Sequence, residues 1–167
     1  MAQKTQDFIY RINKLFKCRH EYSDNLIYSS EEAFGYSLRS GEVVMGQFYG
    51  FNDFNNKVVL DYGCGSGGKT VFYATQGPSR MIGVDLEMDN LVAQGYAAKN
   101  NIRVEFFKLN PAGMTPLSDN SVDIVISSSV IEHLLQVESA LSEIKRVLKR
   151  GGFFLTAGIL FVLVSEA

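Results

Sequence analysis

The chain has 167 residues, a length that suits one compact domain with its own hydrophobic core. Hydrophobic residues make up 46% of the sequence and aromatic residues 12%, a composition that excludes a disordered or fibrous chain. The 16 basic and 18 acidic side chains nearly cancel, so the charge predicts no nucleic-acid partner and no binding to an anionic membrane.

The cysteines and the apolar segments give an expectation about location. Cys18 and Cys64 have the spacing neither of a metal site nor of a disulfide framework, which favours a reducing compartment. The polar start Met1–Gln6 is unlike a secretory signal, and the apolar run Phe153–Val164 is too short to span a bilayer. We therefore expect a cytoplasmic protein without a metal site or a membrane-spanning segment.

The first part of the chain, residues 1–56, has the pattern of a helical cover. Apolar residues recur at helical spacing over Thr5–Cys18, which predicts an amphipathic helix. Ser29 and Glu32 form a capping-box pattern, so a second helix is expected to begin there and to end at Gly41. Residues 46–56 are rich in Gly, Asn and aromatic residues and predict a loop into the core domain, residues 57–167.

Predicted strands and helices alternate along the core domain. The predicted strands are Val58–Asp61, Met81–Asp85, Arg103–Phe107, Val122–Ser127 and Phe153–Thr156. The predicted helices are Lys69–Gln76, Met88–Lys99 and Val137–Lys149, with the last one ended by the pair Gly151-Gly152. This order predicts a doubly wound α/β fold: a mostly parallel sheet of about five strands with helices on both faces.

The turn after the first predicted strand is rich in glycine and reads Asp61-Tyr62-Gly63-Cys64-Gly65-Ser66-Gly67-Gly68. Glycines here let the backbone approach a ligand closely and present its N–H groups. The same letters fit the dinucleotide pattern G-x-G-x-x-G. A tight turn that binds no ligand is the third interpretation.

Asp85 ends the second predicted strand, at the edge where open α/β sheets bind their ligands. A carboxylate at this position can accept hydrogen bonds from both hydroxyls of a ribose. The alternative is that Asp85 only caps the next helix. Its position beside the glycine-rich turn favours the ligand.

Four segments together resemble the successive motifs of class I S-adenosylmethionine-dependent methyltransferases. In chain order they are VVLDYGCGSGG, IGVDLE, PLSDNSVDIVISSSVIEHL and EIKRVLKRGGFFLT, and they cover roughly residues 57–156. Asp61, directly before the glycines, also resembles that family and is unlike the usual apolar lead-in of nicotinamide enzymes. The resemblance implies a Rossmann-like fold, S-adenosyl-L-methionine as the cofactor and transfer of its methyl group.

The resemblance also implies roles for single residues. Asp61 would lie near the amino-acid end of the cofactor, Asp85 would hold the ribose hydroxyls, and Leu86 would flank the adenine. The residues that border the cofactor would be Gly63, Cys64, Gly65 and Gly67.

Asn110 stands where the family commonly has an acid that accepts a hydrogen bond from the adenine amino group. Its amide oxygen can still accept such a bond, but it brings no charge. Because Pro111 follows, Asn110 could instead be a turn residue only.

The end of the fourth predicted strand supplies the candidates for chemistry. The resemblance places Ser127 and Ser128 where the cofactor meets its substrate. His133 could take a proton from an attacking hydroxyl or amine, and Glu132 could orient it. The competing interpretation is that both residues lie in the first turn of a helix, where Glu132 favours the helix dipole and His133 packs.

The chain ends at Ala167, before the further helix and edge hairpin that family members usually have. We therefore expect a C-terminally shortened core, either a catalyst that methylates a small molecule or a module that binds the cofactor without turnover. An uncovered edge from Phe153 onward would favour self-association, as in a homodimer.

Overall fold

A five-stranded sheet in the order β3-β2-β1-β4-β5 forms the centre of the protein, and all of its strand pairs are parallel. The computed structural model describes residues 29–48, 51, 53–87 and 90–157. The strands are β1 (Val58–Tyr62), β2 (Arg80–Asp85), β3 (Glu105–Lys108), β4 (Val122–Ser128) and β5 (Leu148–Ala157). The helices are α2 (Ser30–Gly46), α3 (Gly68–Ala74), α4 (Leu91–Lys99), the short 3-10 helix η1 (Ile131–His133) and α5 (Val137–Val147).

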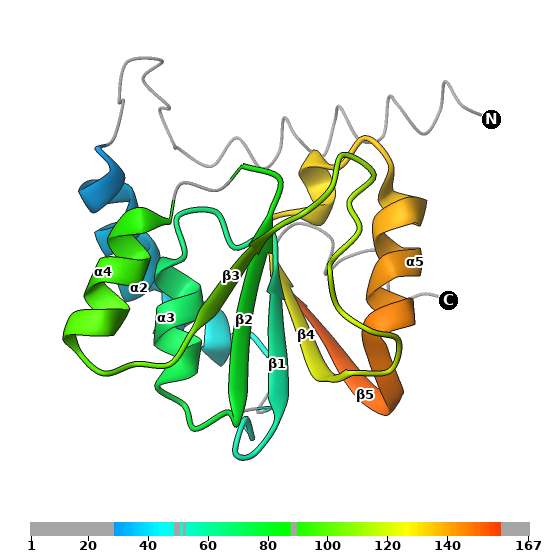
Figure 1. The fold of residues 1–167 in the computed structure, drawn as a ribbon, viewed down its shortest axis with the longest axis horizontal. Helices are drawn as coiled ribbons and strands as arrows, with labels where there is room; N and C mark the ends of the chain where they lie inside the picture. Colours follow the sequence, from blue (N-terminus) through cyan, green and yellow to red (C-terminus); the bar gives the residue numbers. More distant parts are fainter. Residues whose placement is uncertain (1–28, 49–50, 52, 88–89, 158–167) are drawn as a thin grey trace.

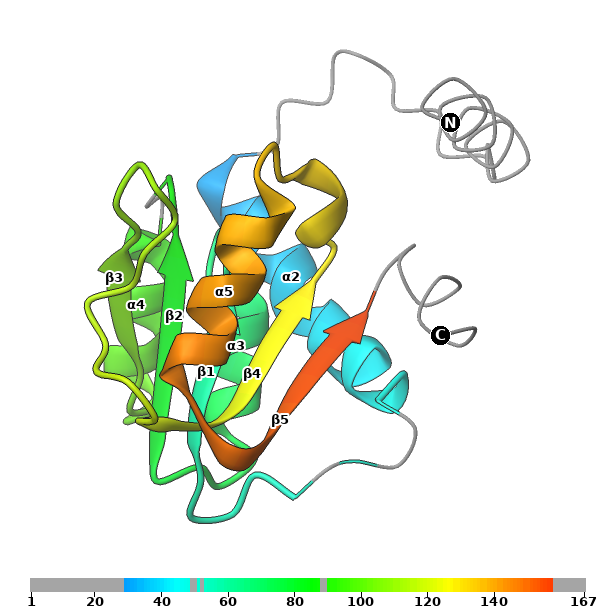
Figure 2. The same cartoon turned by 90° about the vertical axis from the view of Figure 1, so that its right-hand side faces the viewer.

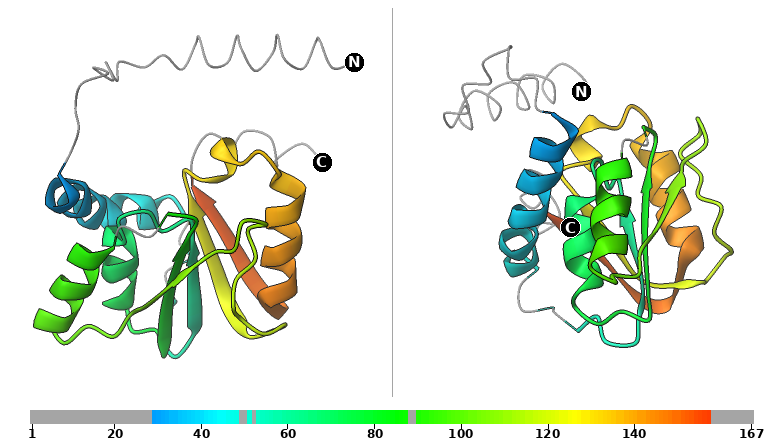
Figure 3. Two further views of the ribbon diagram at one scale, coloured as in Figure 1. Left: turned by 45° about the horizontal axis from the view of Figure 1, so that its top comes forward. Right: turned by 60° about the vertical axis from the view of Figure 1, so that its left-hand side comes forward.

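Helices cover both faces of the sheet, which confirms the predicted fold class. Helices α2, α3 and α4 lie on one face and α5 lies on the other (Figures 1 and 3). Along β1, Val59 packs on the α3 face, whereas Leu60 packs on the α5 face. Both are fully buried, as expected for a central strand of a parallel sheet.

The strand order reverses between β1 and β4, and this reversal positions the candidate site. The chain moves outward from β1 to β2 and β3, and then returns to pair β4 with the other side of β1. Open α/β sheets bind ligands at the carboxyl ends of the strands at such a switch point. Asp61 lies on one side of it, and Ile126 is its neighbour across the switch.

Helix α2 begins as predicted but continues past Gly41, so the predicted end of this helix was wrong. The capping box of Ser29 and Glu32 is present in both directions, which confirms the start. A Cβ on Gly41 would lie 2.6 Å from the ring of Phe72 on α3. Gly41 therefore serves the close contact of α2 with α3, and the helix extends to Gly46.

The N-terminal region and the core domain share hydrophobic contacts. Phe34 of α2 is buried in one cluster with Val71 and Ala93. A Cβ on Gly68, the first residue of α3, would lie 2.5 Å from the carbonyl oxygen of Phe34. The described part of the predicted cover is therefore packed on the core; the predicted helix Thr5–Cys18 lies outside the described residues.

The transition from α5 to β5 differs from the prediction. Helix α5 ends at Val147 and β5 begins at Leu148, so Gly151 and Gly152 lie inside the strand. The strand pairing explains the difference, because Leu148 is already the partner of Val122 and the register then shifts before Ile124. The glycines lie at this irregularity and do not end the helix.

Strand β5 is an edge strand among the described residues, and it faces the viewer in Figure 2. Phe153 on this strand is 51% exposed, although its ring lies 4.7 Å from the ring of Phe51. Association through this edge stays a prediction. None of the described helices is long and apolar enough to cross a membrane.

Candidate functional site

The candidate site lies at the carboxyl ends of the strands, at the upper edge of the sheet in Figure 1. The glycine-rich loop from β1 to α3, the residues after β2 and the short helix η1 after β4 meet there. The fold thus brings the sequence motifs to one edge, as predicted.

The three glycines of the loop all have positive φ angles, but their surroundings differ. The angles are 84° at Gly63, 52° at Gly65 and 77° at Gly67. A Cβ on Gly63 would lie 2.3 Å from the side chain of Val130, and one on Gly67 would lie 2.8 Å from the ring of Phe106. A Cβ on Gly65 would meet nothing within 4 Å. Gly65 alone of the three therefore faces open space, where a ligand would fit.

The N–H groups of the predicted glycines Gly63, Gly65 and Gly67, and that of Cys64, all donate within the protein, so this geometry gives no support to the predicted presentation of loop N–H groups to a ligand. The N–H groups of Gly63 and Cys64 donate to the carbonyl oxygen of Val84, at 2.8 and 3.0 Å. The N–H of Gly65 donates to Oδ2 of Asp85 at 2.7 Å. These donors connect the loop to β2, so ligand binding here relies on side chains and on the space over Gly65.

Asp85 is held in place from two sides. Besides the bond from Gly65, its Oδ1 accepts from the N–H of Glu87 at 3.1 Å. Because helix α4 begins only at Leu91, the alternative that Asp85 caps this helix is wrong. A carboxylate offers about four acceptor positions, so the fixed carboxylate of Asp85 keeps free positions for the hydroxyls of a ligand.

Asp61 is a buried carboxylate whose surroundings the sequence did not reveal. It is 1% exposed, and its Oδ2 accepts from the hydroxyl of Thr70 at 2.7 Å. Burial raises the pKa of Asp61 from 3.8 to about 6, although the Thr70 hydroxyl and the Lys69 ammonium favour the charged form. Thr70 and Lys69 lie in the first turn of α3, directly after the glycine-rich loop. Their position just after this loop was the one sequence signal that could have placed both residues near Asp61.

Cys64 and Leu86 point in different directions. The Cys64 side chain is 2% exposed, and its Sγ would lie 3.1 Å from a Cβ on Gly83 of β2. Burial raises the pKa of this thiol, which keeps it protonated. The side chain of Cys64 is therefore not available to a ligand. Leu86 is 45% exposed at the end of β2, as a residue that flanks a ligand would be.

Asn110 organises a turn after β3. Its Oδ1 accepts from the N–H groups of Ala112 and Met114, at 3.0 and 2.9 Å. These two bonds occupy the amide oxygen that an adenine amino group would need, and they explain Asn110 as a turn residue. The adenine contact stays a prediction without support from this geometry.

The serines at the end of β4 are both buried. The Ser127 hydroxyl is fully buried and has no hydrogen-bond partner among the residues that the structure describes. The Ser128 hydroxyl accepts from Nζ of Lys69 at 3.3 Å. Successive residues of a strand face opposite sides, so only Ser128 lies toward α3.

Glu132 and His133 form part of η1, a single turn that precedes α5. Both side chains are exposed, which does not support the part of the competing interpretation in which His133 packs, whereas their place in a helical turn agrees with that interpretation. Val130, directly before this turn, packs against Gly63, which places η1 beside the glycine loop. The predicted catalytic role of the pair stays a prediction.

Two surface hollows lie elsewhere, at the opposite edge of the sheet. One of about 500 Å³ is formed by the turn from α5 to β5, and one of about 820 Å³ by the starts of β2 and β3. Neither is lined by a predicted site residue. Within the described residues, no three His, Cys, Asp or Glu side chains are grouped so as to hold a metal ion.

The family model of the methyltransferase domain matches residues 60–156, which contain the glycine loop, Asp85 and η1. The chain belongs to this methyltransferase family. A ribosomal protein L11 methyltransferase of Dictyoglomus thermophilum is 34% identical over 103 residues, which are 61% of this chain and 32% of that protein. A ubiquinone biosynthesis O-methyltransferase of Rickettsia bellii is 33% identical over 103 residues, which are 60% of this chain and 42% of that protein.

A solved structure shows the same fold. It is the phosphoethanolamine N-methyltransferase 2 of Haemonchus contortus in complex with phosphomonomethylethanolamine and S-adenosylhomocysteine, with a TM-score of 0.62 and 25% identity. The match covers 80% of this chain and 34% of that one. The methyltransferase domain thus spans less than half the length of these relatives.

Proposed function

We propose that this methyltransferase domain binds S-adenosyl-L-methionine at the carboxyl edge of β1, β2 and β4 and transfers the methyl group to a small-molecule acceptor. The observation that carries the proposal is Asp85, which is fixed by Gly65 and Glu87 beside open space over Gly65. A ribose with two neighbouring hydroxyls suits this carboxylate, and the glycine leaves room for the rest of the ligand.

The residues present fit this cofactor. Asp85 would hold the ribose, Leu86 would lie against the adenine, and Asp61 would lie near the amino-acid end. When bound, S-adenosyl-L-methionine supplies an activated methyl group on a sulfonium sulfur. The protein then has mainly to bind and to orient, because an activated donor needs no strong acid or base.

His133 would accept the proton that an acceptor hydroxyl or amine loses, and Glu132 would orient the acceptor or His133. The exposed position of both on η1, next to the glycine loop through Val130, supports this role. Small-molecule acceptors occur among the similar proteins, since one is named for ubiquinone biosynthesis and one holds phosphomonomethylethanolamine. Another is named for ribosomal protein L11, so a protein acceptor is the rival outcome of the test.

Thermal unfolding with S-adenosyl-L-methionine, S-adenosylhomocysteine and NAD in turn tests the cofactor. A ligand at a hundredfold excess over its Kd stabilises the native state by about 2.7 kcal/mol, which raises Tm by roughly 5–11 °C for a chain of this size. We expect Asp85→Ala to abolish the shift and His133→Ala to keep it. Stabilisation by NAD alone, or equal loss in both variants, would contradict the proposed site.

Methyl transfer is tested by the formation of S-adenosylhomocysteine with a set of small amines and phenols and with ribosomal protein L11. We expect turnover with a small molecule and a lower rate for His133→Ala. Turnover with L11 alone would overturn the proposed acceptor class, and binding without any turnover would indicate a non-catalytic binding module.

A further inference from the structure

Lys69 connects α3 to the end of β4. It is the second residue of α3, and its Nζ donates to the hydroxyl of Ser128 at 3.3 Å. Its backbone N–H donates to the hydroxyl of Ser37 on α2 at 3.1 Å, which fixes the start of the side chain. The ammonium therefore lies at the switch point, on the side of the sheet that Asp61 also faces.

The charge of Lys69 has no full partner in this part of the chain. Among the described residues Lys69 forms no salt bridge, and Ser128 gives it one neutral acceptor for three ammonium donors. Asp61 attracts the ammonium, but its carboxylate is hydrogen-bonded to Thr70. The site thus combines a half-buried positive group and a buried carboxylate that do not neutralise each other by contact.

Two opposite charges held apart suit a ligand that itself has two opposite charges. We propose that Lys69 binds the carboxylate of the ligand's α-amino acid group, while Asp61 lies near its ammonium. The inference rests on the proposed function, because S-adenosyl-L-methionine ends in such a group. It makes Lys69 the residue that selects ligands with this carboxylate over shortened analogues that lack it.

Calorimetric titration with two ligands tests this role. The first ligand is S-adenosylhomocysteine and the second is its decarboxylated analogue, which keeps the amine. A hydrogen bond to a charged group is typically worth roughly ten- to hundredfold in affinity, so the wild type should prefer the first ligand by about that factor. In Lys69→Met the preference should vanish, because only the first ligand loses a partner.

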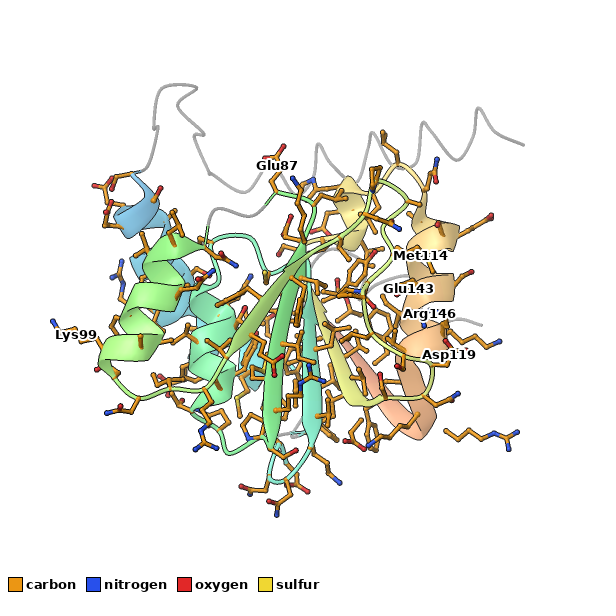
Figure 4. The ribbon with its side chains drawn as sticks, viewed as in Figure 1. Glu87, Lys99, Met114, Asp119, Glu143 and Arg146 are labelled. Carbon is orange, nitrogen blue, oxygen red and sulfur yellow. The ribbon has the colours of Figure 1, made fainter. Side chains whose placement is uncertain are left out.

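The matched control is Lys99→Met, which removes an exposed lysine from the end of α4, far from the strand ends (Figure 4). This variant should keep the wild-type preference. Binding of the decarboxylated analogue by Lys69→Met would show that this variant is folded. If Lys69 had only a structural role, Lys69→Met would weaken the binding of both ligands alike. Equal weakening, an unchanged preference, or a wild type without preference would each overturn the role of Lys69. A wild type that binds neither ligand would instead refute the proposed function.

Discussion

The substitution Asp61→Asn should stabilise the protein and weaken ligand binding at the same time. Asp61 is buried, and its pKa in the folded state is about 6, against 3.8 for an unburied group. One pKa unit corresponds to 1.36 kcal/mol, so ionisation of Asp61 lowers the stability of the wild type by at most about 3 kcal/mol. An amide has no such cost and still accepts the hydrogen bond from Thr70.

The pH range of the effect follows from the sign of the shift. Because the folded state holds the Asp61 proton more tightly than the unfolded state, the favourable contribution is complete below pH 3.8 and is lost as the pH rises through about 6. The stability gain from Asp61→Asn should therefore grow between pH 4 and pH 6 and stay constant above. A gain of about 3 kcal/mol corresponds to roughly 6–12 °C in Tm for a chain of this size.

Urea unfolding of wild type and variant at pH 4 to 8 measures the stability difference, and calorimetric titration with S-adenosylhomocysteine measures binding. Asp53→Asn is the matched control, because it removes the same charge from an exposed residue whose carboxylate, within the described part of the chain, accepts only from the N–H of Asn55. A variant Asp61→Asn that is destabilised at pH 7.5, or a difference that does not change with pH, would refute the reasoning. It would mean that Lys69 and Thr70 outweigh the effect of burial.

Two further predictions concern structural residues. Glu143→Gln should lower the free energy of unfolding by about 3 kcal/mol, because it leaves the Arg146 guanidinium without its buried anionic partner. Asp119→Asn removes an exposed carboxylate from the same guanidinium and should lower the free energy of unfolding by under about 1 kcal/mol. Equal losses of the two variants in urea unfolding would contradict this. Gly63→Ala should lower the free energy of unfolding several-fold more than Gly65→Ala, because both glycines have a positive φ but only a Cβ at position 63 would meet Val130. Gly65→Ala should nevertheless abolish the binding of S-adenosylhomocysteine. A folded Gly65→Ala variant that binds this ligand normally would exclude the space over Gly65 as the ligand site.

The network around Glu143 shows what the sequence could not predict. Glu143 on α5 is buried, and one of its oxygens accepts from both the N–H and the hydroxyl of Thr115, at 2.8 Å each. Burial opposes its charged form, but hydrogen bonds from Arg146 and Thr115 outweigh burial and hold the pKa of Glu143 below 4.5. The three residues come from α5 and from the loop between β3 and β4, where Figure 4 shows Met114 and Asp119 beside them. Glu143 and Arg146 are three residues apart on one helix, but the pairing of Glu143 with Thr115 spans 28 residues and has no local pattern in the sequence.

The parts that the sequence did predict depend on local rules. Apolar runs between glycine and polar breaks predicted every strand of the sheet, and the capping box of Ser29 and Glu32 predicted the start of α2. The two wrongly predicted helix ends lie at glycines, because a glycine can end a helix, form an irregular strand or allow a close contact. Gly41 allows α2 to contact α3, and Gly151 lies in β5 with a φ of 76°. Which of these three roles a glycine has depends on how the surrounding helices and strands pack.

The two buried carboxylates, Glu143 and Asp61, differ in the effect of their charge on the fold. Glu143 is matched by Arg146 and Thr115, its pKa is lowered, and its charge stabilises the fold. Asp61 receives one hydroxyl and a lysine that does not contact it, and its pKa is raised, so its charge opposes folding. A chain selected for stability alone would have an amide or an apolar residue at position 61. At the proposed cofactor site, a positively charged group of the ligand would lower the pKa of Asp61 and would offset this unfavourable contribution to folding.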